Sequence, residues 1–342
     1  MNIFNFIQKL KFEYNHISFK FKLDNSKLWN KIFDQLKYKS INFSNNFIEY
    51  QYIYNEYHEK EVDDISLIIF YKDVPIGLVP LFYLKKKNKL IFLNNGIPFP
   101  AFVDKIDNET EDSIIKNIIQ FFLKLKKELN LRELNFFQHG PNIKGEFRDL
   151  ESKQEKILSN DIDYDLYLDL NLDTNEIKKN FRKSYLNIIN KKLVDNVNIF
   201  DPRKDDIKIW YDFKKLHQEV AERKTRSDQS WEKQLINIKE KKAEFLYYIK
   251  NNKLIGGSFF DITIDEAYYS VGAYNDLAKK IYLSHYIQNT AIMHFKSKKI
   301  KWYFLGKYFE NSNSIISQKE INIAFFKKGF SSDIVKNYKL KY

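Results

Sequence analysis

The sequence contains one twelve-residue pattern twice, and this repeat limits the folds that the chain can adopt. SLIIFYKDVPIG spans Ser66–Gly77 and FLYYIKNNKLIG spans Phe245–Gly256, at a constant offset of 179 residues. Each copy has an apolar run of strand length, a short polar turn and a second apolar run that opens with Ile-Gly. We therefore predict a tandem duplication of one α/β domain. The alternative is that any two segments with this element order look alike.

Hydrophobic periodicity predicts alternating strands and helices in both halves. The expected elements of the first half are strands at Ile65–Tyr71, Ile76–Leu84, Leu90–Leu93 and Leu134–Phe137, and a helix at Glu109–Leu129. Those of the second half are helices at Thr174–Leu193, Asp205–Arg223, Leu283–Phe295 and Gln318–Lys327, and strands at Asn196–Phe200, Phe245–Lys250, Leu254–Asp261, Ala267–Ala273 and Lys301–Leu305. The polar segment Lys153–Asp161 lacks periodicity and is the expected link. We predict domains at residues 1–152 and 153–342, each a mixed, mostly antiparallel sheet flanked by helices.

The composition excludes several kinds of site. The chain has no cysteine, so disulfides, zinc–thiolate sites and a cysteine nucleophile are ruled out. Its 6 histidines lack the spacing of a metal site, so we expect no metal. No apolar run reaches the roughly 18–20 residues that a membrane span needs, and the N-terminal segment has no apolar signal core. We therefore expect a soluble, cytoplasmic protein.

The formal net charge of +12 favours anionic partners, which include nucleic acid, nucleotide phosphates and acidic lipid. The alternative is a lysine-rich, solvated surface without a specific partner. Charge alone does not choose among these partners.

Two basic stretches of the second half are candidate sites for anionic groups. The predicted helix around Lys178–Lys192 carries the candidate binding residues Arg182, Lys183 and Tyr185. The run His217–Trp231 ends a helix and enters a loop that is dense in functional groups, namely His217, Glu222, Arg223, Lys224, Thr225, Arg226, Ser227 and Trp231. Arginines suit bidentate binding of carboxylate or phosphate, and Glu222 could accept a proton from an amine. The alternatives are a solvated basic helix face, a surface loop with internal ion pairs, and a packed histidine at His217.

Two further stretches supply hydroxyls, small residues and lysines. The stretch Glu266–Asp276, which includes the expected strand Ala267–Ala273, contains Tyr269, Ser270, Gly272 and Tyr274, and its small residues permit close approach of a ligand to the backbone. Ser284 and His285 begin the next helix. Lys307 follows the last expected strand, and Lys327 ends the last expected helix. The alternatives are ordinary strand packing and a lysine placed by the helix dipole.

Together these stretches resemble the FemAB-like proteins, over roughly Asp163–Leu340. The matching elements are FRKSYLNIINK (Phe181–Lys191), HQEVAERKTRSDQSW (His217–Trp231), YYSVGAY (Tyr268–Tyr274), the LSH helix start (Leu283–His285) and FKKGF (Phe326–Phe330). The second element is similar to the BioF-like acetyltransferase branch, whose members are often linked to polysaccharide gene clusters. The resemblance implies two GNAT-like domains that transfer an acyl or aminoacyl group to an amine of a cell-envelope glycan or peptidoglycan precursor.

The resemblance also implies roles for single residues. Lys327 matches the lysine that is thought to stabilise the developing oxyanion, and Arg182 would face the phosphates of the precursor. The strand that contains Tyr269 would splay from its neighbour and leave room for the acyl group. Independently of the resemblance, our hypothesis is that Glu222 or Tyr269 relays the proton and that Arg226 and Arg182 anchor anionic substrate groups.

The donor stays open at this stage. GNAT enzymes that use acetyl-CoA hold its pyrophosphate at a glycine-rich turn, whereas the matching turn Asn275–Ser284 has no glycine. The donor is therefore either aminoacyl-tRNA or acyl-CoA, and no cofactor is expected to bind tightly. The alternatives are a non-catalytic module that binds a nucleotide-linked precursor or tRNA, and a CoA-dependent N-acetyltransferase with an atypical donor loop. A peripheral contact with anionic lipid is a further expectation.

Overall fold

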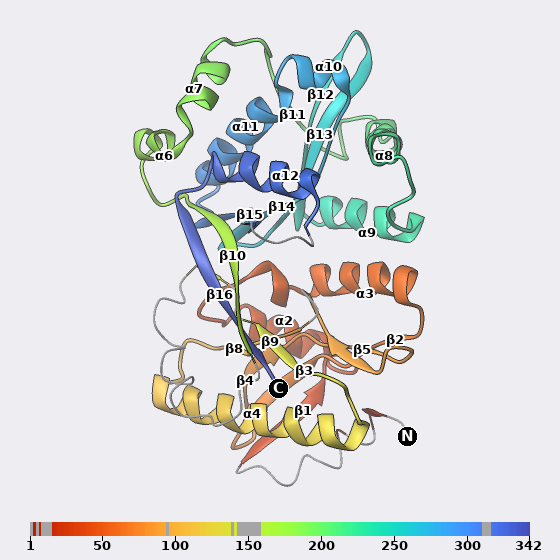
Figure 1. Cartoon of the computed structure of the whole chain (residues 1–342), viewed down its shortest axis with the longest axis vertical. Coiled ribbons are helices and arrows are strands. Elements are labelled where there is room, and N and C mark those ends of the chain that lie inside the picture. The colour runs from red at the N-terminus through yellow and green to blue at the C-terminus, as the bar shows by residue number, and fades with distance from the viewer. Residues whose placement is uncertain are drawn as a thin grey trace. The chain divides into compact units, whose positions relative to one another are not determined.

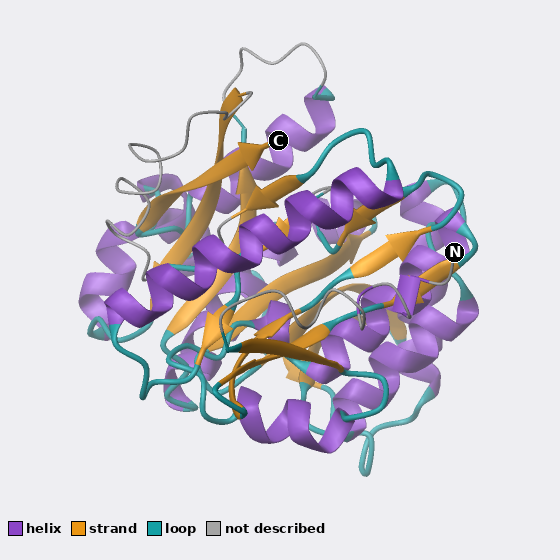
Figure 2. Cartoon of the chain, turned by 90° about the horizontal axis from the view of Figure 1, so that it is seen from below, coloured by secondary structure: helices purple, strands orange, loops and turns teal. Residues whose placement is uncertain are grey.

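The chain forms two compact units of mixed α/β structure. The computed structural model describes residues 3–4, 7, 16–93, 96–137, 140–141, 159–309 and 316–342. Unit 1 comprises Met1–Ile162 and Asn337–Tyr342, and unit 2 comprises Asp163–Lys336. Helices flank the sheets in each unit, and most strand pairs are antiparallel, as expected (Figures 1 and 2). The expected boundary between residues 152 and 153 lies outside the described residues.

Unit 1 contains a four-stranded antiparallel sheet in the order β1-β3-β4-β8 and a three-stranded sheet in the order β2-β5-β6. In addition, β9 pairs with β7 and with the last residues of β16. The bounds are β1 (Ile17–Phe21), α2 (Ser26–Phe33), the 3-10 helix η1 (Ile41–Phe43), α3 (Asn45–Glu59), β2 (Val62–Asp64), β3 (Leu67–Tyr71), β4 (Val74–Val79), β5 (Phe82–Leu84), β6 (Lys89–Ile91), β7 (Ile97–Pro98), β8 (Ala101–Phe102), α4 (Asn108–Leu129) and β9 (Asn135–Phe137).

Unit 2 is built on a sheet in the order β11-β12-β13-β14-β15-β10, in which β14 and β15 are parallel and the other pairs are antiparallel. Strand β16 begins in this unit and ends in unit 1. The bounds are β10 (Ser159–Asp169), α6 (Thr174–Asn180), α7 (Lys183–Asn190), β11 (Asn198–Ile199), α8 (Lys208–Ala221), α9 (Asp228–Lys239), β12 (Ala243–Lys250), β13 (Lys253–Ile262), β14 (Glu266–Tyr274), α10 (Asp276–Lys280), α11 (Leu283–Ser297), β15 (Trp302–Tyr308), α12 (Gln318–Lys328) and β16 (Asp333–Lys341).

Two apolar cores cover the two faces of the unit 2 sheet. On one face, side chains of β10, β13 and β15 pack with α6, α7 and α11. On the other face, β12 and β13 pack with α8 and α9 around Trp210, Phe245 and Trp231. Figure 1 shows α8 and α9 on the side of the strands away from α6 and α7. Residues from β13 and β14 therefore reach both cores, as the period of two in a strand requires.

The repeated sequence pattern forms equivalent hairpins in the two units. In the β3–β4 hairpin the register shifts after Ile69, which lies opposite Gly77, and in the β12–β13 hairpin it shifts after Tyr248, which lies opposite Gly256. The corresponding residues are 179 positions apart in the sequence. Both turns contain two consecutive residues with positive φ, namely Lys72 and Asp73, and Asn251 and Asn252. Such turns match the twist of the paired strands. The sequence repeat is therefore also a repeat of register, bulge and turn.

Two expected elements are wrong in detail. The expected helix at Thr174–Leu193 is divided into α6 and α7, because Phe181 is extended and the backbone N–H of Arg182 donates to the carbonyl of Gly329 at 2.8 Å. The expected strand at Ile76–Leu84 is divided into β4 and β5 around Pro80, which lacks an N–H for a sheet ladder.

Candidate active site at the divergence of two strands

Strands β14 and β15 run side by side for only three residues and then separate. The pairs join Glu266–Tyr268 to Trp302–Phe304. Beyond Tyr268, β14 stays paired with β13 as far as Tyr274, and β15 stays paired with β10 as far as Tyr308. We call the place just after Tyr268 and Phe304 the divergence point. The backbone groups that face each other there are not used in a β14–β15 ladder, so a ligand can approach them.

The side chain of Lys327 reaches the divergence point from the last turn of α12. A Cβ atom added to Gly306 on β15 would lie 2.7 Å from Lys327 Nζ. The same Nζ lies 5.0 Å from the ring centroid of Tyr269, the first residue of β14 beyond the paired segment. The ammonium group is thus held between a glycine of one separating strand and an aromatic face of the other, which is a favourable cation–π arrangement.

The surroundings of Lys327 make its ammonium group more acidic than usual. The residue as a whole is partly accessible, but its charged end lies among packed groups, and this burial lowers the pKa of Lys327 to about 8. The carboxylate of Asp165, which is itself buried on β10, opposes the shift and favours the charged form. Lys327 is therefore still a cation at neutral pH, and a poorly hydrated cation is a strong hydrogen-bond donor.

The hydroxyl of Tyr269 belongs to a buried network. It has hydrogen-bond partners in Ser258, Tyr274 and Gln288, and Ser258 Oγ lies 2.6 Å from Tyr274 Oη. Burial raises the pKa of Tyr269, so the hydroxyl stays protonated near neutral pH. A Cβ atom on Gly272 would lie 2.1 Å from this hydroxyl. Tyr269 is accordingly suited to donate a hydrogen bond, and the small residue at position 272 is required for its rotamer.

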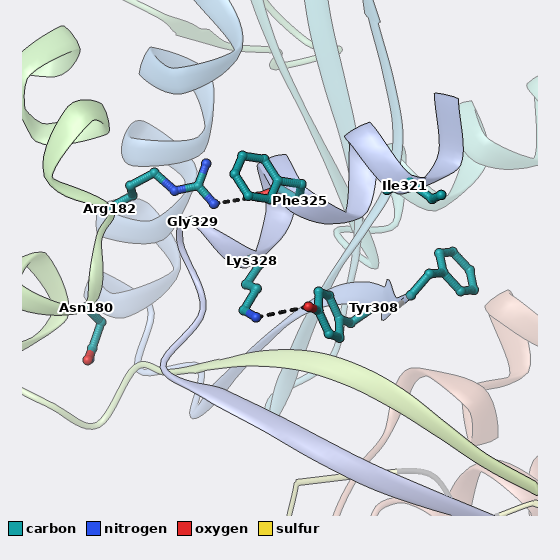
Figure 3. A pocket seen from close by; sticks show the side chains of 8 residues that line it. Asn180, Arg182, Tyr308, Ile321, Phe325, Lys328 and Gly329 are labelled. Atoms are coloured by element: carbon teal, nitrogen blue, oxygen red, sulfur yellow. Dashed lines mark hydrogen bonds between the residues drawn. The ribbon is translucent and has the colours of Figure 1, made fainter. Parts of the chain in front are cut away.

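A pocket with two cations lies at the end of α12. Its volume is about 560 Å³, and its lining residues are Asn180, Arg182, Tyr308, Phe309, Ile321, Phe325, Lys328 and Gly329 (Figure 3). Lys328 Nζ donates to Tyr308 Oη at 3.0 Å. None of the lining residues that the structure describes is acidic, and the charges of Arg182 and Lys328 suit a phosphate or carboxylate group.

Arg182 is positioned by its contacts with α7 and α12. Nη1 donates to Tyr185 Oη at 2.9 Å, Nη2 donates to the carbonyl of Phe325 at 3.0 Å, and the guanidinium lies 3.8 Å from the Phe325 ring centroid. Tyr185 is buried against Gly329, where a Cβ would lie 2.1 Å from the ring. Since Lys328 faces the pocket and the preceding residue Lys327 faces the divergence point, one turn of α12 serves both places.

Ser284 and His285 lie in the first turn of α11. The ring of His285 packs edge-on against Tyr185, with centroids 4.5 Å apart, and against Phe326 at 5.1 Å. Burial lowers the pKa of His285 to about 4, so the imidazole is neutral at physiological pH. We therefore assign His285 to the packing that supports Tyr185 and Arg182.

Arg226 belongs to the connection between α8 and α9 and lies in a second polar cluster. It is buried, donates from Nη1 to Gln234 Oε1 at 3.3 Å and lies over the ring of Trp231 at 4.8 Å. His217 packs against the same Trp231. Its pKa is lowered to about 4, mainly by burial and to a smaller extent by the positive charge of Arg226. His217 is thus packed and neutral, and its buried Nδ1 has no hydrogen-bond partner among the described residues.

The residue that sequence reasoning missed is Asp261 on β13. It is buried, its Oδ2 accepts a hydrogen bond from Ser270, and burial raises its pKa to about 7. Hydrogen bonding from Ser270 and the charge of Arg226 partly offset that rise. An acid inside a strand between Phe and Ile residues was the available signal, because such a position normally carries an apolar side chain.

Several other candidates lie on the surface of unit 2. Lys183, Glu222, Arg223 and Lys224 are exposed, and Glu222 ends α8 in a left-handed conformation. Lys224 pairs with Asp228 at 3.2 Å, and Lys307 pairs with Asp163. Ser227 caps α9 by accepting from the N–H of Ser230, and Thr225 is half-buried before it. The ion pairs within this loop match the surface alternative for Lys224, and no described contact joins Glu222 to Lys327.

The turn after β14 differs from a phosphate-binding turn. Its residues form the short helix α10, whose N-terminus is capped by the side chain of Asn275, which accepts from the N–H of Ala278. Asp276 adds a negative charge to the first turn. A side chain and a carboxylate thus occupy the place where a pyrophosphate would need free N–H groups and positive potential.

Within the described part of the chain, no helix is long and apolar enough to cross a membrane. Nor do the described residues contain a group of three or more His, Cys, Asp or Glu side chains that could hold a metal ion.

The comparisons with known proteins support the fold. No family model matches the sequence, and no curated protein matches it. Among solved structures, FemX has a TM-score of 0.63 at 11% identity, covering 92% of this chain and 95% of its own. A conserved protein of unknown function from Bacteroides thetaiotaomicron has a TM-score of 0.61 at 13% identity, covering 94% and 98%. L-PGS from Bacillus licheniformis has a TM-score of 0.52 at 13% identity, covering 78% and 81%. The chain therefore shares its fold with FemX and with L-PGS.

Proposed function

We propose that this protein is an acyltransferase that moves an acyl or aminoacyl group onto an amine of a cytoplasmic cell-envelope precursor. The observation that carries the proposal is the ammonium group of Lys327 between Gly306 and Tyr269, where β14 and β15 separate. An acyl carbonyl placed there would have a cationic donor directed at its oxygen.

The arrangement suits the transition state of aminolysis. When an amine attacks an ester or thioester, negative charge develops on the carbonyl oxygen, and a fixed cationic donor stabilises that charge more than it stabilises the neutral substrate. Lys327 is such a donor because its group is buried and protonated below about pH 8. The ester or thioester that donates the acyl group is already activated. The enzyme therefore has two remaining tasks, which are to position the two substrates and to remove a proton from the amine.

The pocket beside α12 is suited to the anionic part of the acceptor. Arg182 and Lys328 supply two positive charges, and Phe325 and Tyr308 supply apolar surface for a sugar or base. An envelope precursor that carries phosphate, whether a peptidoglycan precursor or another glycan, has these chemical features. We propose that Arg182 fixes the phosphate while the amine of the same molecule extends towards Lys327.

The donor is the less constrained substrate. The capped α10 and its Asp276 disfavour the pyrophosphate of CoA at the usual place, which favours a donor such as aminoacyl-tRNA. A CoA-dependent N-acetyltransferase with another donor geometry, and a module that binds without transfer, are the outcomes that the experiment must separate.

The experiment measures transfer of radiolabel from mixed aminoacyl-tRNA or from acetyl-CoA to two acceptors, a UDP-linked muramyl pentapeptide with a lysine side chain and a UDP-linked amino sugar. We expect transfer in at least one combination, and a loss of roughly a hundredfold or more in kcat for Lys327→Ala. The control is Lys208→Ala, an exposed lysine at the start of α8, which should keep wild-type activity. Stabilisation by acceptor alone, with no transfer from either donor, would instead identify a binding module.

A further inference from the structure

Ser270 is the extra residue of a β-bulge, and the bulge directs it to a buried acid. In the β13–β14 ladder, Phe259 pairs with Val271 and Phe260 pairs with Tyr269, so Ser270 has no residue opposite it. Its hydroxyl donates to Oδ2 of Asp261, the next residue along β13. Bulges occur beside active sites, where they redirect a side chain. This bulge begins one residue after the last pair that joins β14 to β15.

Ser270 lies on the part of β14 that directly follows the divergence point. Tyr269, whose ring faces the ammonium of Lys327, is the chain neighbour of Ser270. Ser270 is partly accessible, whereas Asp261 is only 3% exposed. A hydrogen bond therefore connects an accessible hydroxyl at the divergence point with a carboxylate inside the sheet.

Among the described residues around Asp261, Arg226 carries the opposite charge that acts on its carboxylate. The connection between α8 and α9 contributes Arg226, β12 places the apolar Ala243 opposite Asp261, and β14 places Tyr268 opposite it. Burial disfavours the charged form of the acid more than Arg226 favours it, and the pKa of Asp261 is raised to about 7. The carboxylate thus takes and releases a proton at the pH where an enzyme of this kind works.

We propose that Ser270 and Asp261 form the proton relay of the transfer reaction, in which Ser270 contacts the acceptor amine and Asp261 receives the proton. The proposal rests on the acyltransferase function proposed above and assigns the residues that prepare the nucleophile. It replaces Glu222 and Tyr269 in that role, since Glu222 is exposed and Tyr269 holds its proton.

The acceptor nitrogen loses two protons during the transfer. The acceptor enters as an ammonium ion and passes one proton to Ser270 Oγ, while the hydroxyl proton of Ser270 moves to the Asp261 carboxylate. The neutral amine forms a C–N bond with the donor carbonyl, and Lys327 stabilises the oxyanion. As the bond from carbon to the leaving oxygen or sulfur breaks, the second amine proton goes to the leaving group. Asp261 then releases its proton to solvent.

The test compares kcat/KM across pH for the wild type, Asp261→Asn and Ser270→Ala, with the donor and acceptor pair that supports transfer. We expect both variants to lose roughly a hundredfold or more at neutral pH. In these variants the rise of kcat/KM with pH should move from about pH 7 to around pH 10, where the amine itself ionises. The rate difference from the wild type should shrink at high pH, because a free amine needs no relay.

Folding and a matched acid control keep the result interpretable. Glu244→Gln removes another buried acid of the same sheet, one that is paired with His294 at 2.6 Å. In this variant kcat/KM should still rise at about pH 7. If Asp261→Asn does not fold, Ser270→Ala decides the matter, because it alters a partly accessible side chain. Infrared difference spectra between the wild type and Asp261→Asn should show a carboxyl that titrates near neutral pH.

The two proposals fail in different ways. A wild-type protein that transfers no acyl group in any combination overturns the acyltransferase function and the relay together. An active wild type whose Ser270→Ala and Asp261→Asn variants keep its rate and its pH limb overturns the relay alone.

Discussion

The ammonium group of Lys327 occupies the space that a side chain at Gly306 would need. An added Cβ would lie 2.7 Å from Nζ, and Gly306 has a φ of +107°, a conformation that residues with a side chain rarely adopt. The ammonium of Lys327 can therefore lie at the divergence point only because residue 306 on β15 has no side chain. This relationship links backbone conformation directly to the proposed oxyanion site.

Gly306→Ala should consequently reduce activity and stability together. The strained φ should cost about 1–2 kcal/mol in the free energy of unfolding, and the displaced ammonium should lower kcat by tenfold or more. Denaturant unfolding and transfer assays measure the two effects. Gly140→Ala is the matched control, because Gly140 also has positive φ, +126°, but lies in unit 1. Equal activity in the two variants would show that Lys327 does not need its present position.

Lys327 should make the protein more stable as the pH rises. Its pKa is about 8 in the folded protein and 10.5 when unperturbed. Below pH 8 both states hold the proton, and the folded state carries the cost of burying a charge. Between about 8 and 10.5 the unfolded state binds more protons, so stability rises with pH, by up to about 3 kcal/mol for this shift.

Lys327→Met should remove that rise and should be the more stable protein at pH 7, although it is inactive. The measurement is the free energy of unfolding in urea at several pH values. If the free energies of unfolding of the variant and the wild type change in parallel from pH 7 to 10, the ammonium of Lys327 is not buried as described.

Arg182→Ala should weaken binding of the acceptor rather than slow the chemistry. A charge-assisted contact to phosphate contributes about 1.5–3 kcal/mol, so KM for a phosphate-bearing acceptor should rise roughly tenfold to a hundredfold. Arg182→Lys should recover only part of the loss, since lysine lacks the planar fork. Lys208→Ala, which alters an exposed lysine of α8 that is not among the described lining residues of the pocket, is the control and should leave KM unchanged. A fall in kcat with an unchanged KM would remove the phosphate role from Arg182.

The sequence repeat was a reliable guide to the fold because a hairpin is specified locally. Turn residues and alternating apolar positions determine both strands, and the register of β3–β4 recurs in β12–β13 down to the bulge. The break between α6 and α7 could not be predicted in the same way. It depends on the contact of Arg182 with Gly329, a residue almost 150 positions away that enters through tertiary structure alone.

The candidate site was only partly predictable for the same reason. Lys327, Arg182 and Ser270 lie in stretches that resemble a family, so their residue types were visible in the sequence. Asp261 could not be assigned, because its role depends on a bulge that places Ser270 beside it and on the burial that raises its pKa. Likewise, the many charges of the loop at Glu222–Arg226 concealed that only Arg226 is buried.

The wild-type activity should have a narrow optimum between the two shifted groups. Asp261 must be deprotonated to accept a proton, so kcat/KM should rise as the pH passes about 7. Lys327 must be protonated to donate to the oxyanion, so kcat/KM should fall as the pH passes about 8. Two such ionisations give a bell-shaped profile. The imidazoles of His217 and His285 do not contribute near neutrality, because their pKa values are about 4.

Lys327→Arg separates the two limbs of this profile. A guanidinium stays protonated at every pH of the assay, so a variant that retains measurable transfer should keep the rising limb near 7 and lose the falling limb near 8. Asp261→Asn should show the reverse, with a rise that follows the amine and a fall that still follows Lys327. A falling limb that stays at about 8 in Lys327→Arg would assign that ionisation to another group, and the oxyanion role of Lys327 would have to be abandoned.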